Sequence, residues 1–457
     1  MLKSTIFREY DIRGVADAEL TSQGVAALGQ ALGTYLRRHA GPNLCLGRDT
    51  RLSSPRLRDA LMSGLKASGC RVTDIGVQPT PLLYYATVHR NADGGVMITG
   101  SHNPPEFNGF KTVLGSGTIH GEEIQEIRRM IETGDLDRGA GSEETADVAA
   151  PYVEEVASQF QFPRRIRVVV DAGNGTGGPV MRRILERLNV EAHEMFFEMD
   201  GRFPNHHPDP TVPRYLEALI ARVLETKADL GIAFDGDADR LGAVDERGAI
   251  LWGDQLMVLY AREILARKPG ATFIGEVKCS QLMYDDIAAH GGHPIMWKTG
   301  HSLIKAKMKE TGAALAGEMS GHMFFADRYH GYDDAIYAAC RLIEIVAQSA
   351  RPLSTHLADL PRTVTTPEIR FDCPDEIKFD VVRRAAAELR AGHRTVDVDG
   401  VRVLFEEGWG LVRASNTQPV LVMRFEASTP ALLSRYRGDV ESVVERAKVE
   451  AERAGAR

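Results

Sequence analysis

The chain has 457 residues, of which 43% are hydrophobic and 26% are charged, so its composition is that of a globular protein with more than one hydrophobic core. A net charge of −8 argues against nucleic-acid binding, and no apolar run reaches the roughly 20 residues that span a membrane. The five cysteines are scattered and the first residues lack an apolar signal-peptide core, so we expect a cytoplasmic protein with reduced thiols.

Strand-like and helix-like segments alternate along the chain, which predicts an α/β fold with mostly parallel sheets. The same rhythm occurs three times, and each repeat ends in a strand followed by a polar, glycine-containing loop. Ligands bind beyond the carboxyl ends of strands in such sheets, so the three loops are expected to face one cleft. The predicted strands are 43–49, 70–76, 94–100, 165–173, 228–234, 271–277, 293–299 and 313–318, and the predicted helices are 54–69, 80–90, 179–188, 212–227, 280–291 and 301–312.

Two polar stretches divide the chain. Residues 133–150 contain few large apolar side chains, and residues 350–368 carry three prolines, so both are predicted linkers. The segment that follows is rich in strands and closes with a mixed-charge helix at 432–455. These patterns predict three similar βα domains and a smaller α+β domain around one central cleft, with boundaries at 1–146, 147–248, 249–361 and 362–457.

Asp235, Asp237 and Asp239 alternate directly after an apolar strand. Carboxylates so close together repel one another unless a cation lies between them, and Mg²⁺ prefers oxygen ligands. A solvated turn, a phosphatase with an aspartate nucleophile and an EF-hand are alternatives. The EF-hand would place Glu246 at position 12, but it needs glycine where Arg240 stands.

Ser101 and His102 follow another predicted strand, and Lys111 lies ten residues further on. A serine at a strand end is often a turn former, and a single lysine is often a surface charge. A serine that carries a phosphoryl group is the functional alternative. A serine hydrolase is disfavoured because the chain has no GxSxG sequence.

Two further loops carry groups that suit phosphorylated sugars. Arg413, Ser415, Asn416 and Thr417 follow a predicted strand and combine an arginine fork with hydroxyl and amide donors, although an ordinary polar hairpin would look similar. The loop at 317–322 offers a carboxylate, a hydroxyl and an imidazole from Glu318, Ser320 and His322.

The sequence GNGTGG at 173–178 matches the GxGxxG pattern of dinucleotide-binding proteins. Glu191 and Glu194 follow at roughly the expected spacing of 20 residues, but the segment that contains them is ambiguous as a strand. We therefore favour tight packing between a helix and a strand as the reason for these glycines.

Together the loops resemble those of the α-D-phosphohexomutase superfamily, and within it the bacterial phosphomannomutase/phosphoglucomutase branch. The resemblance covers essentially the whole chain, and the motifs occur in family order. They are FREYDIRG (7–14), TGSHNPPEFNGFK (99–111), DGDADR (235–240), GEMSGH (317–322) and RASNTQP (413–419).

The resemblance implies a role for each matching residue. Ser101 would carry the phosphoryl group and, with Asp235, Asp237 and Asp239, would bind one Mg²⁺. Tyr10 and Arg13 would line the cleft, while His102, Lys111 and Arg240 would lie at the transfer site, with Lys111 and His322 as general acid and base. The sugar would contact Lys278, Gly300, His301, Glu318, Ser320 and His322, and Arg413, Ser415, Asn416 and Thr417 would hold the distal phosphate.

The resemblance also implies a reaction. A hexose 1-phosphate would become a hexose 6-phosphate through glucose or mannose 1,6-bisphosphate, which acts as intermediate and activator. The expected partners are phosphosugars alone, with a monomeric chain and no nucleic acid or membrane. A Mg²⁺-dependent sugar phosphatase and a non-catalytic sugar-phosphate-binding protein are the alternatives, and the preference between glucose and mannose stays open.

Overall fold

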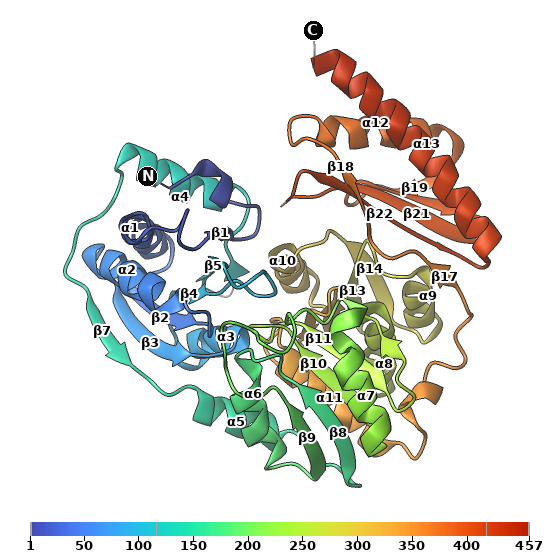
Figure 1. The fold of residues 1–457 in the computed structure, drawn as a ribbon, viewed down its shortest axis with the longest axis horizontal. Helices are drawn as coiled ribbons and strands as arrows, with labels where there is room; N and C mark the ends of the chain where they lie inside the picture. The colour runs from blue at the N-terminus through green and yellow to red at the C-terminus, as the bar shows by residue number, and fades with distance from the viewer. Residues whose placement is uncertain (1, 116, 417, 456–457) are drawn as a thin grey trace.

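The computed structural model describes residues 2–115, 117–416 and 418–455. Within these residues four β-sheets follow one another along the chain, each accompanied by helices (Figure 1). Central strands such as β4 (Gly94–Ile98) and β10 (Leu230–Phe234) are buried along their whole length, as expected for strands covered on both faces. The predicted α/β class with a separate C-terminal domain is confirmed.

The first sheet has the order β1-β5-β4-β2-β3-β7, with β6 beside β5. β2 pairs in parallel with β3 and β4, so the loop after β4 leaves the carboxyl edge of the sheet. The prediction of a linker at 133–150 is wrong in part, because β7 lies within it and pairs with β3. The elements are η1 (Ser4–Ile6), β1 (Ile12–Val15), α1 (Ser22–His39), β2 (Asn43–Arg48), α2 (Ser54–Ala67), β3 (Arg71–Val77), α3 (Thr80–His89), β4 (Gly94–Ile98), β5 (Phe107–Leu114), β6 (Gly117–Thr118), α4 (Glu122–Thr133) and β7 (Ser142–Thr145).

The second sheet has the order β12-β11-β10-β8-β9, and β10 lies parallel to β8 but antiparallel to β11. The acidic loop at 235–240 is therefore the connection between β10 and β11. The elements are α5 (Ala149–Ser158), β8 (Ile166–Asp171), α6 (Gly177–Leu185), β9 (Val190–Met195), η2 (Pro213–Leu216), α7 (Glu217–Thr226), β10 (Leu230–Phe234), β11 (Leu241–Asp245) and β12 (Ile250–Leu251).

The third sheet has the order β14-β13-β15-β16. β15 and β16 form an antiparallel pair whose connection is the loop with Glu318, Ser320 and His322. The elements are α8 (Gly253–Arg267), β13 (Thr272–Glu276), α9 (Gln281–Ala289), β14 (His293–Trp297), α10 (His301–Thr311), β15 (Leu315–Gly317), β16 (Met323–Phe325), α11 (Ala335–Gln348) and η3 (Leu353–Thr355).

The fourth sheet is antiparallel, with the order β17-β22-β21-β20-β19 and with β18 beside β22. In Figure 1 α12 and α13 cover its outer side, and the other side faces the third sheet, where Trp409 and Leu411 pack on Val277. The elements are β17 (Val364–Thr365), β18 (Ile369–Asp372), α12 (Lys378–Gly392), β19 (Arg394–Val396), β20 (Val401–Phe405), β21 (Gly408–Ala414), β22 (Val420–Ala427) and α13 (Pro430–Gly455).

The cores explain how the four parts are held. One hydrophobic cluster runs through the first three sheets, from Cys45 to Leu353, whereas the fourth sheet and its two helices have a cluster of their own. The loops after β4, β10 and β15 are thereby fixed against one another. The predicted domain boundaries stay a prediction, although β12, just beyond residue 248, belongs to the second sheet.

Candidate active site

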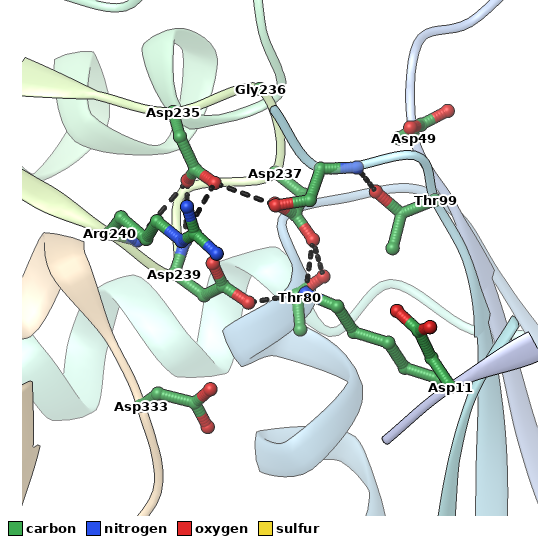
Figure 2. A network of polar contacts seen from close by, with 12 residues as sticks. Asp11, Asp49, Thr80, Thr99, Asp235, Gly236, Asp237, Asp239, Arg240 and Asp333 are labelled. Atoms are coloured by element: carbon green, nitrogen blue, oxygen red, sulfur yellow. Dashed lines mark hydrogen bonds and ion pairs between the residues drawn. The ribbon is translucent and has the colours of Figure 1, made fainter. Parts of the chain in front are cut away.

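The acidic loop lies fully inside the protein. Asp235, Asp237 and Asp239 each have no exposed surface, and the backbone amides of Asp239 and Arg240 donate to Asp235 Oδ1 at 3.1 and 3.2 Å. Their burial excludes a solvated turn, and the flanking strands β10 and β11 exclude the helix-flanked EF-hand. Figure 2 shows the three carboxylates turned toward one another beside Arg240.

A buried lysine supplies the positive charge in this loop. Lys111, on β5, donates to Asp237 Oδ2 at 2.8 Å and also to Asp239, while Thr80 Oγ1 donates to Asp237 at 2.6 Å. Burial would raise the pKa of all three carboxyls, but Lys111 turns the shift downward for Asp237 and Asp239. Asp235 has no bond to Lys111, so burial and its two acidic neighbours raise its pKa well above the usual range.

The oxygen atoms fit a divalent cation. One oxygen from each of Asp235, Asp237 and Asp239 lies within 4.8 Å of the others. Asp237 Oδ1 is buried and accepts no hydrogen bond from the described residues, Asp239 Oδ1 is buried and lies 3.3 Å from His322 Nε2, and Ser101 Oγ donates to Asp235 Oδ2 at 2.8 Å. Three carboxylates and a hydroxyl form the all-oxygen donor set that Mg²⁺ selects.

Ser101 stands in the tightly constrained loop between β4 and β5, residues 99–106, which we call the serine loop. It is 2% exposed, and its φ of 49° lies in the left-handed region, which a non-glycine residue adopts only when its surroundings hold it there. Its amide donates to Thr99 Oγ1 at 2.8 Å, and a Cβ on Gly236 would lie 2.6 Å from its carbonyl oxygen. Glycine at 236 therefore allows the serine loop and the acidic loop to touch.

Two basic side chains flank the serine. His102 Nδ1 lies 3.2 Å from Ser101 Oγ, and burial, helped by Arg240 and Arg13, lowers the pKa of His102 well below its usual range. Arg13 reaches the same loop by donating to Asn103 at 3.1 Å. The imidazole of His102 is therefore neutral at neutral pH, and the guanidinium groups carry the positive charge.

The loop at 317–322 joins this cluster through His322. Its Nδ1 lies 2.8 Å from Glu318 and 3.0 Å from Ser320 Oγ, and its Nε2 lies 3.3 Å from Asp239. Burial alone would lower the pKa of His322, but Asp239 and Glu318 raise it to about 9. The imidazole is therefore protonated at neutral pH and can donate a proton.

The remaining predicted residues line a second region, where three sheets meet. Tyr10 donates to the carbonyl of Thr299 at 2.8 Å and accepts from Asn416 Nδ2 at 2.6 Å. Gly300 donates its amide to Glu318 at 2.8 Å, and a Cβ on Gly300 would lie 2.7 Å from the Tyr10 ring. The first, third and fourth parts of the chain thus meet at the Tyr10 hydroxyl.

The predicted cationic groups of this second region all lie beside carboxylates. Lys278 lies 3.4 Å from Glu276 and 3.2 Å from Glu368, and Arg413 donates to Asp399 at 2.9 Å. His301, next to Gly300, stacks edge-on with Tyr10. Ser415 accepts from the amide of Gln418, and Thr417 lies outside the described residues.

Comparison with known proteins identifies the family. Four family models match in order, all named phosphoglucomutase/phosphomannomutase: domain I over 4–138, domain II over 150–248, domain III over 252–364 and the C-terminal domain over 368–443. The chain belongs to the phosphoglucomutase/phosphomannomutase family. The resemblance to the α-D-phosphohexomutases is thereby confirmed, and curated relatives and a crystal structure agree with it.

The relatives match over nearly the whole length. The phosphomannomutase/phosphoglucomutase of Pseudomonas aeruginosa is 46% identical over 437 residues, which is 95% of this chain and 94% of that protein. A phosphoglucomutase of Neisseria gonorrhoeae is 43% identical over 96% of each. A crystal structure of a phosphoglucomutase/phosphomannomutase family protein from Burkholderia thailandensis superposes with a TM-score of 0.92 at 43% identity, covering 98% of both chains.

In this member of the phosphoglucomutase/phosphomannomutase family, packing explains the glycine-rich segment at 173–178. A Cβ on Gly175 would lie 2.5 Å from the backbone of Gly236, so the segment supports the acidic loop. The acids required for a dinucleotide site are bound elsewhere, Glu191 to Arg167 and Glu194 to Arg182.

Several residues of the site were not predicted as site residues. Glu276 holds the amide of Met319 and the hydroxyl of Thr299, Asp399 lies between Arg413 and the amide of Thr299, and Arg51 holds the serine loop. Glu276 stands in the sequence GEVKCS at 275–280, which matches the family pattern, but only Lys278 of that sequence was predicted as a site residue. No described helix is long and apolar enough to cross a membrane.

Proposed function

We propose that this chain interconverts hexose 1-phosphates and hexose 6-phosphates by way of a phosphorylated Ser101. The observation that carries the proposal is the 2.8 Å bond between Ser101 Oγ and Asp235, which unites a constrained serine with a buried acidic cluster. Relatives that match nearly the whole chain bear the names phosphomannomutase/phosphoglucomutase and phosphoglucomutase. The substrate class is therefore a phosphorylated hexose, glucose or mannose.

Asp235, Asp237, Asp239 and Ser101 would hold one Mg²⁺, which when bound polarises the phosphoryl oxygens and offsets their negative charge. Around it, Lys111 and Arg240 contribute positive charge to a site with three carboxylates. Phosphoryl transfer depends mainly on positioning and electrostatic stabilisation, so a fixed, water-poor cluster of opposite charges suits it.

Different side chains carry the phosphoryl group and exchange the protons during the transfer. Phospho-Ser101 gives its phosphoryl group to a sugar hydroxyl, the Ser101 oxygen takes up a proton, and the sugar hydroxyl gives one up. Protonated His322 and Lys111 are the candidates for this proton exchange, because both stand at the acidic loop within reach of the serine region.

The sugar and its second phosphate would occupy the region between Glu318 and Arg413. Glu318 and Ser320 bind sugar hydroxyls, Lys278, Gly300 and His301 orient the ring, and Arg413 with Ser415, Asn416 and Thr417 holds the distal phosphate. The hexose 1,6-bisphosphate turns end for end between the two transfers, so this region accepts either orientation. We propose a monomeric, cytoplasmic enzyme that binds no nucleic acid.

The test is turnover of glucose 1-phosphate and mannose 1-phosphate, with Mg²⁺ and a trace of the 1,6-bisphosphate. We expect 6-phosphate without steady release of inorganic phosphate, activity lost in Ser101→Ala, and activity kept in Ser63→Ala, an exposed serine on α2. Steady phosphate release would instead support the phosphatase, and tight binding without any product would support a non-catalytic protein.

A further inference from the structure

A fully buried arginine lies behind the serine loop and touches neither the acidic cluster nor the sugar region. Arg51 stands between β2 and α2, and its side chain has no exposed surface. A buried charge must be paired and hydrogen-bonded, or it costs several kcal/mol, roughly. The contacts of Arg51 therefore indicate which part of the structure its buried charge stabilises.

The guanidinium group of Arg51 donates hydrogen bonds to backbone carbonyls in and beside the serine loop. One terminal nitrogen donates to the carbonyls of Ser101 at 2.8 Å and Asn103 at 2.6 Å. The other donates to the carbonyls of Pro104 and, at 3.0 Å, Phe107. Four carbonyls of the segment 101–107 thus turn toward one side chain.

Arg51 is itself fixed in place. Asp49 accepts from Arg51 Nε at 3.1 Å and from its amide at 3.0 Å, and the same carboxylate accepts the amide of Gly100 at 3.0 Å. A Cβ on Gly100 would lie 2.4 Å from Arg51 Nε, so the loop passes directly over the guanidinium group. From the second part of the chain, Phe203 stacks on it at 5.2 Å.

This arrangement has an electrostatic consequence at Ser101. Carbonyl oxygens carry partial negative charge, and they would repel a phosphoryl group and the three aspartates if they turned toward them. Arg51 donates to four of them, including the Ser101 carbonyl that lies against Gly236 of the acidic loop, and its positive charge offsets their partial negative charge. It also supports the left-handed backbone of Ser101, a conformation that costs about 1–3 kcal/mol for a residue other than glycine.

We infer that Arg51 is a positioning residue for phosphoryl transfer at Ser101. This inference rests on the proposed function. In the transfer, the bond from phosphorus to the Ser101 oxygen forms as the bond to the sugar oxygen breaks, the serine proton leaves to a base, and the sugar oxygen takes up a proton. Arg51 touches none of these atoms, and acts by fixing where the serine oxygen stands.

The positions of the four carbonyls around residue 51 require arginine rather than lysine. Its planar fork offers donors in two directions at once, whereas the single ammonium group of lysine is a point charge. A displacement of about 1 Å at the reacting atoms can cost about 100-fold in rate. The residues proposed to bind the sugar and distal phosphate lie in other loops, so substrate affinity is expected to change little.

The experiment compares wild type, Arg51→Lys, Arg51→Ala and the control Arg38→Ala, whose side chain is 40% exposed and pairs with surface aspartates. Steady-state kcat and KM are measured for glucose 1-phosphate. Rapid-quench mass spectrometry follows phosphorylation of Ser101 by glucose 1,6-bisphosphate in a single turnover. Each measurement on Arg51→Ala is repeated with about 10 mM guanidinium, a concentration far below the molar range that unfolds proteins, and with the same concentration of NaCl.

We expect kcat and the single-turnover rate to fall about 100-fold in both Arg51 variants, with KM nearly unchanged, and guanidinium but not NaCl to restore part of the rate in Arg51→Ala. The control should match wild type. A wild-type rate in Arg51→Lys, or a rise in KM at unchanged kcat, would overturn the inference. If Arg51→Ala does not fold, the kcat, KM and single-turnover rate of Arg51→Lys decide whether the inference holds. Failure of wild type to make product would instead reject the proposed function.

Discussion

Replacing Lys111 by methionine should expose how strongly the acidic cluster depends on one ammonium group. Lys111 is 4% exposed and bonds Asp237 and Asp239, which have no exposed surface. Removing one partner of a buried ion pair costs about 3–5 kcal/mol, because the other charge stays buried without compensation. A loss of 1 kcal/mol lowers the melting temperature by about 2–4 °C in a folding unit of roughly 150–250 residues. On that scale the melting temperature should fall by roughly 6–20 °C.

Mg²⁺ should repair much of this loss, because it supplies positive charge to the same carboxylates. At a free concentration 100-fold above its dissociation constant, a ligand adds about 2.7 kcal/mol of stability. Thermal unfolding is therefore measured in EDTA and in Mg²⁺. The increment caused by Mg²⁺ should be larger in Lys111→Met than in wild type, provided that the site still binds the ion.

Lys66→Met is the matched control. Lys66 is 40% exposed and lies 3.3 Å from Glu143, and an exposed pair of this kind contributes about 0–1 kcal/mol. If Lys111→Met melted in EDTA within about 2 °C of wild type, which corresponds to less than about 1 kcal/mol, Lys111 would not be the charge that holds the cluster together. Equal Mg²⁺ increments in both proteins would refute the link between the lysine and the metal site.

Three further predictions concern other parts of the site. Gly236→Ala should lower conversion by about 100-fold, because its Cβ would lie 2.6 Å from the Ser101 carbonyl, whereas Gly438→Ala, with open space around it, should be normal in the same assay. Arg402→Ala should raise KM and lower the melting temperature, because Arg402 donates to the carbonyls on both sides of Lys278; an unchanged KM would show that this loop needs no support. Burial raises the pKa of Asp334 to about 6, so the folded protein holds this proton more tightly than the unfolded chain and loses stability as pH rises from about 4 to 6. Asp334→Asn has no carboxyl to ionise and lacks that loss, so the melting temperature of the variant minus that of wild type should be larger at pH 7 than at pH 5. An equal difference at the two pH values would contradict the reasoning.

The sequence predicted those elements whose pattern is local. The strands β4, β10 and β15 and the polar loops after them follow from short apolar runs that end in polar, glycine-containing segments. Strand β7 was predicted as linker because all four of its residues are exposed, so no apolar alternation marks it. Helix α11 was not predicted, because thirteen of its residues, from Ala335 to Ala347, are buried and leave little polar face.

The chemistry of the site was also predictable where it depends on neighbours in the chain. The spacing of Asp235, Asp237 and Asp239 indicated a cation, and their clustered carboxylate oxygens, with Asp237 Oδ1 free of any hydrogen bond from the described residues, fit one. The resemblance covered Ser101 and His322 as well, because both stand in distinctive short motifs. Arg51 stands in no motif that we recognised, since a single arginine after a strand carries no sign of what it will contact.

What only the tertiary structure decided is which distant groups meet. Asp239 and His322, or Tyr10 and Asn416, are joined by contacts of 3.3 and 2.6 Å across long stretches of chain. The shared hydrophobic cluster of the first three sheets and the packing of the fourth on Val277 bring them together. The sequence by itself determined the strand-end loops and their donor groups, because these depend on neighbouring residues. Burial, pKa and the partner of each charge depend on packing between sheets, and these were fixed only when the chain folded.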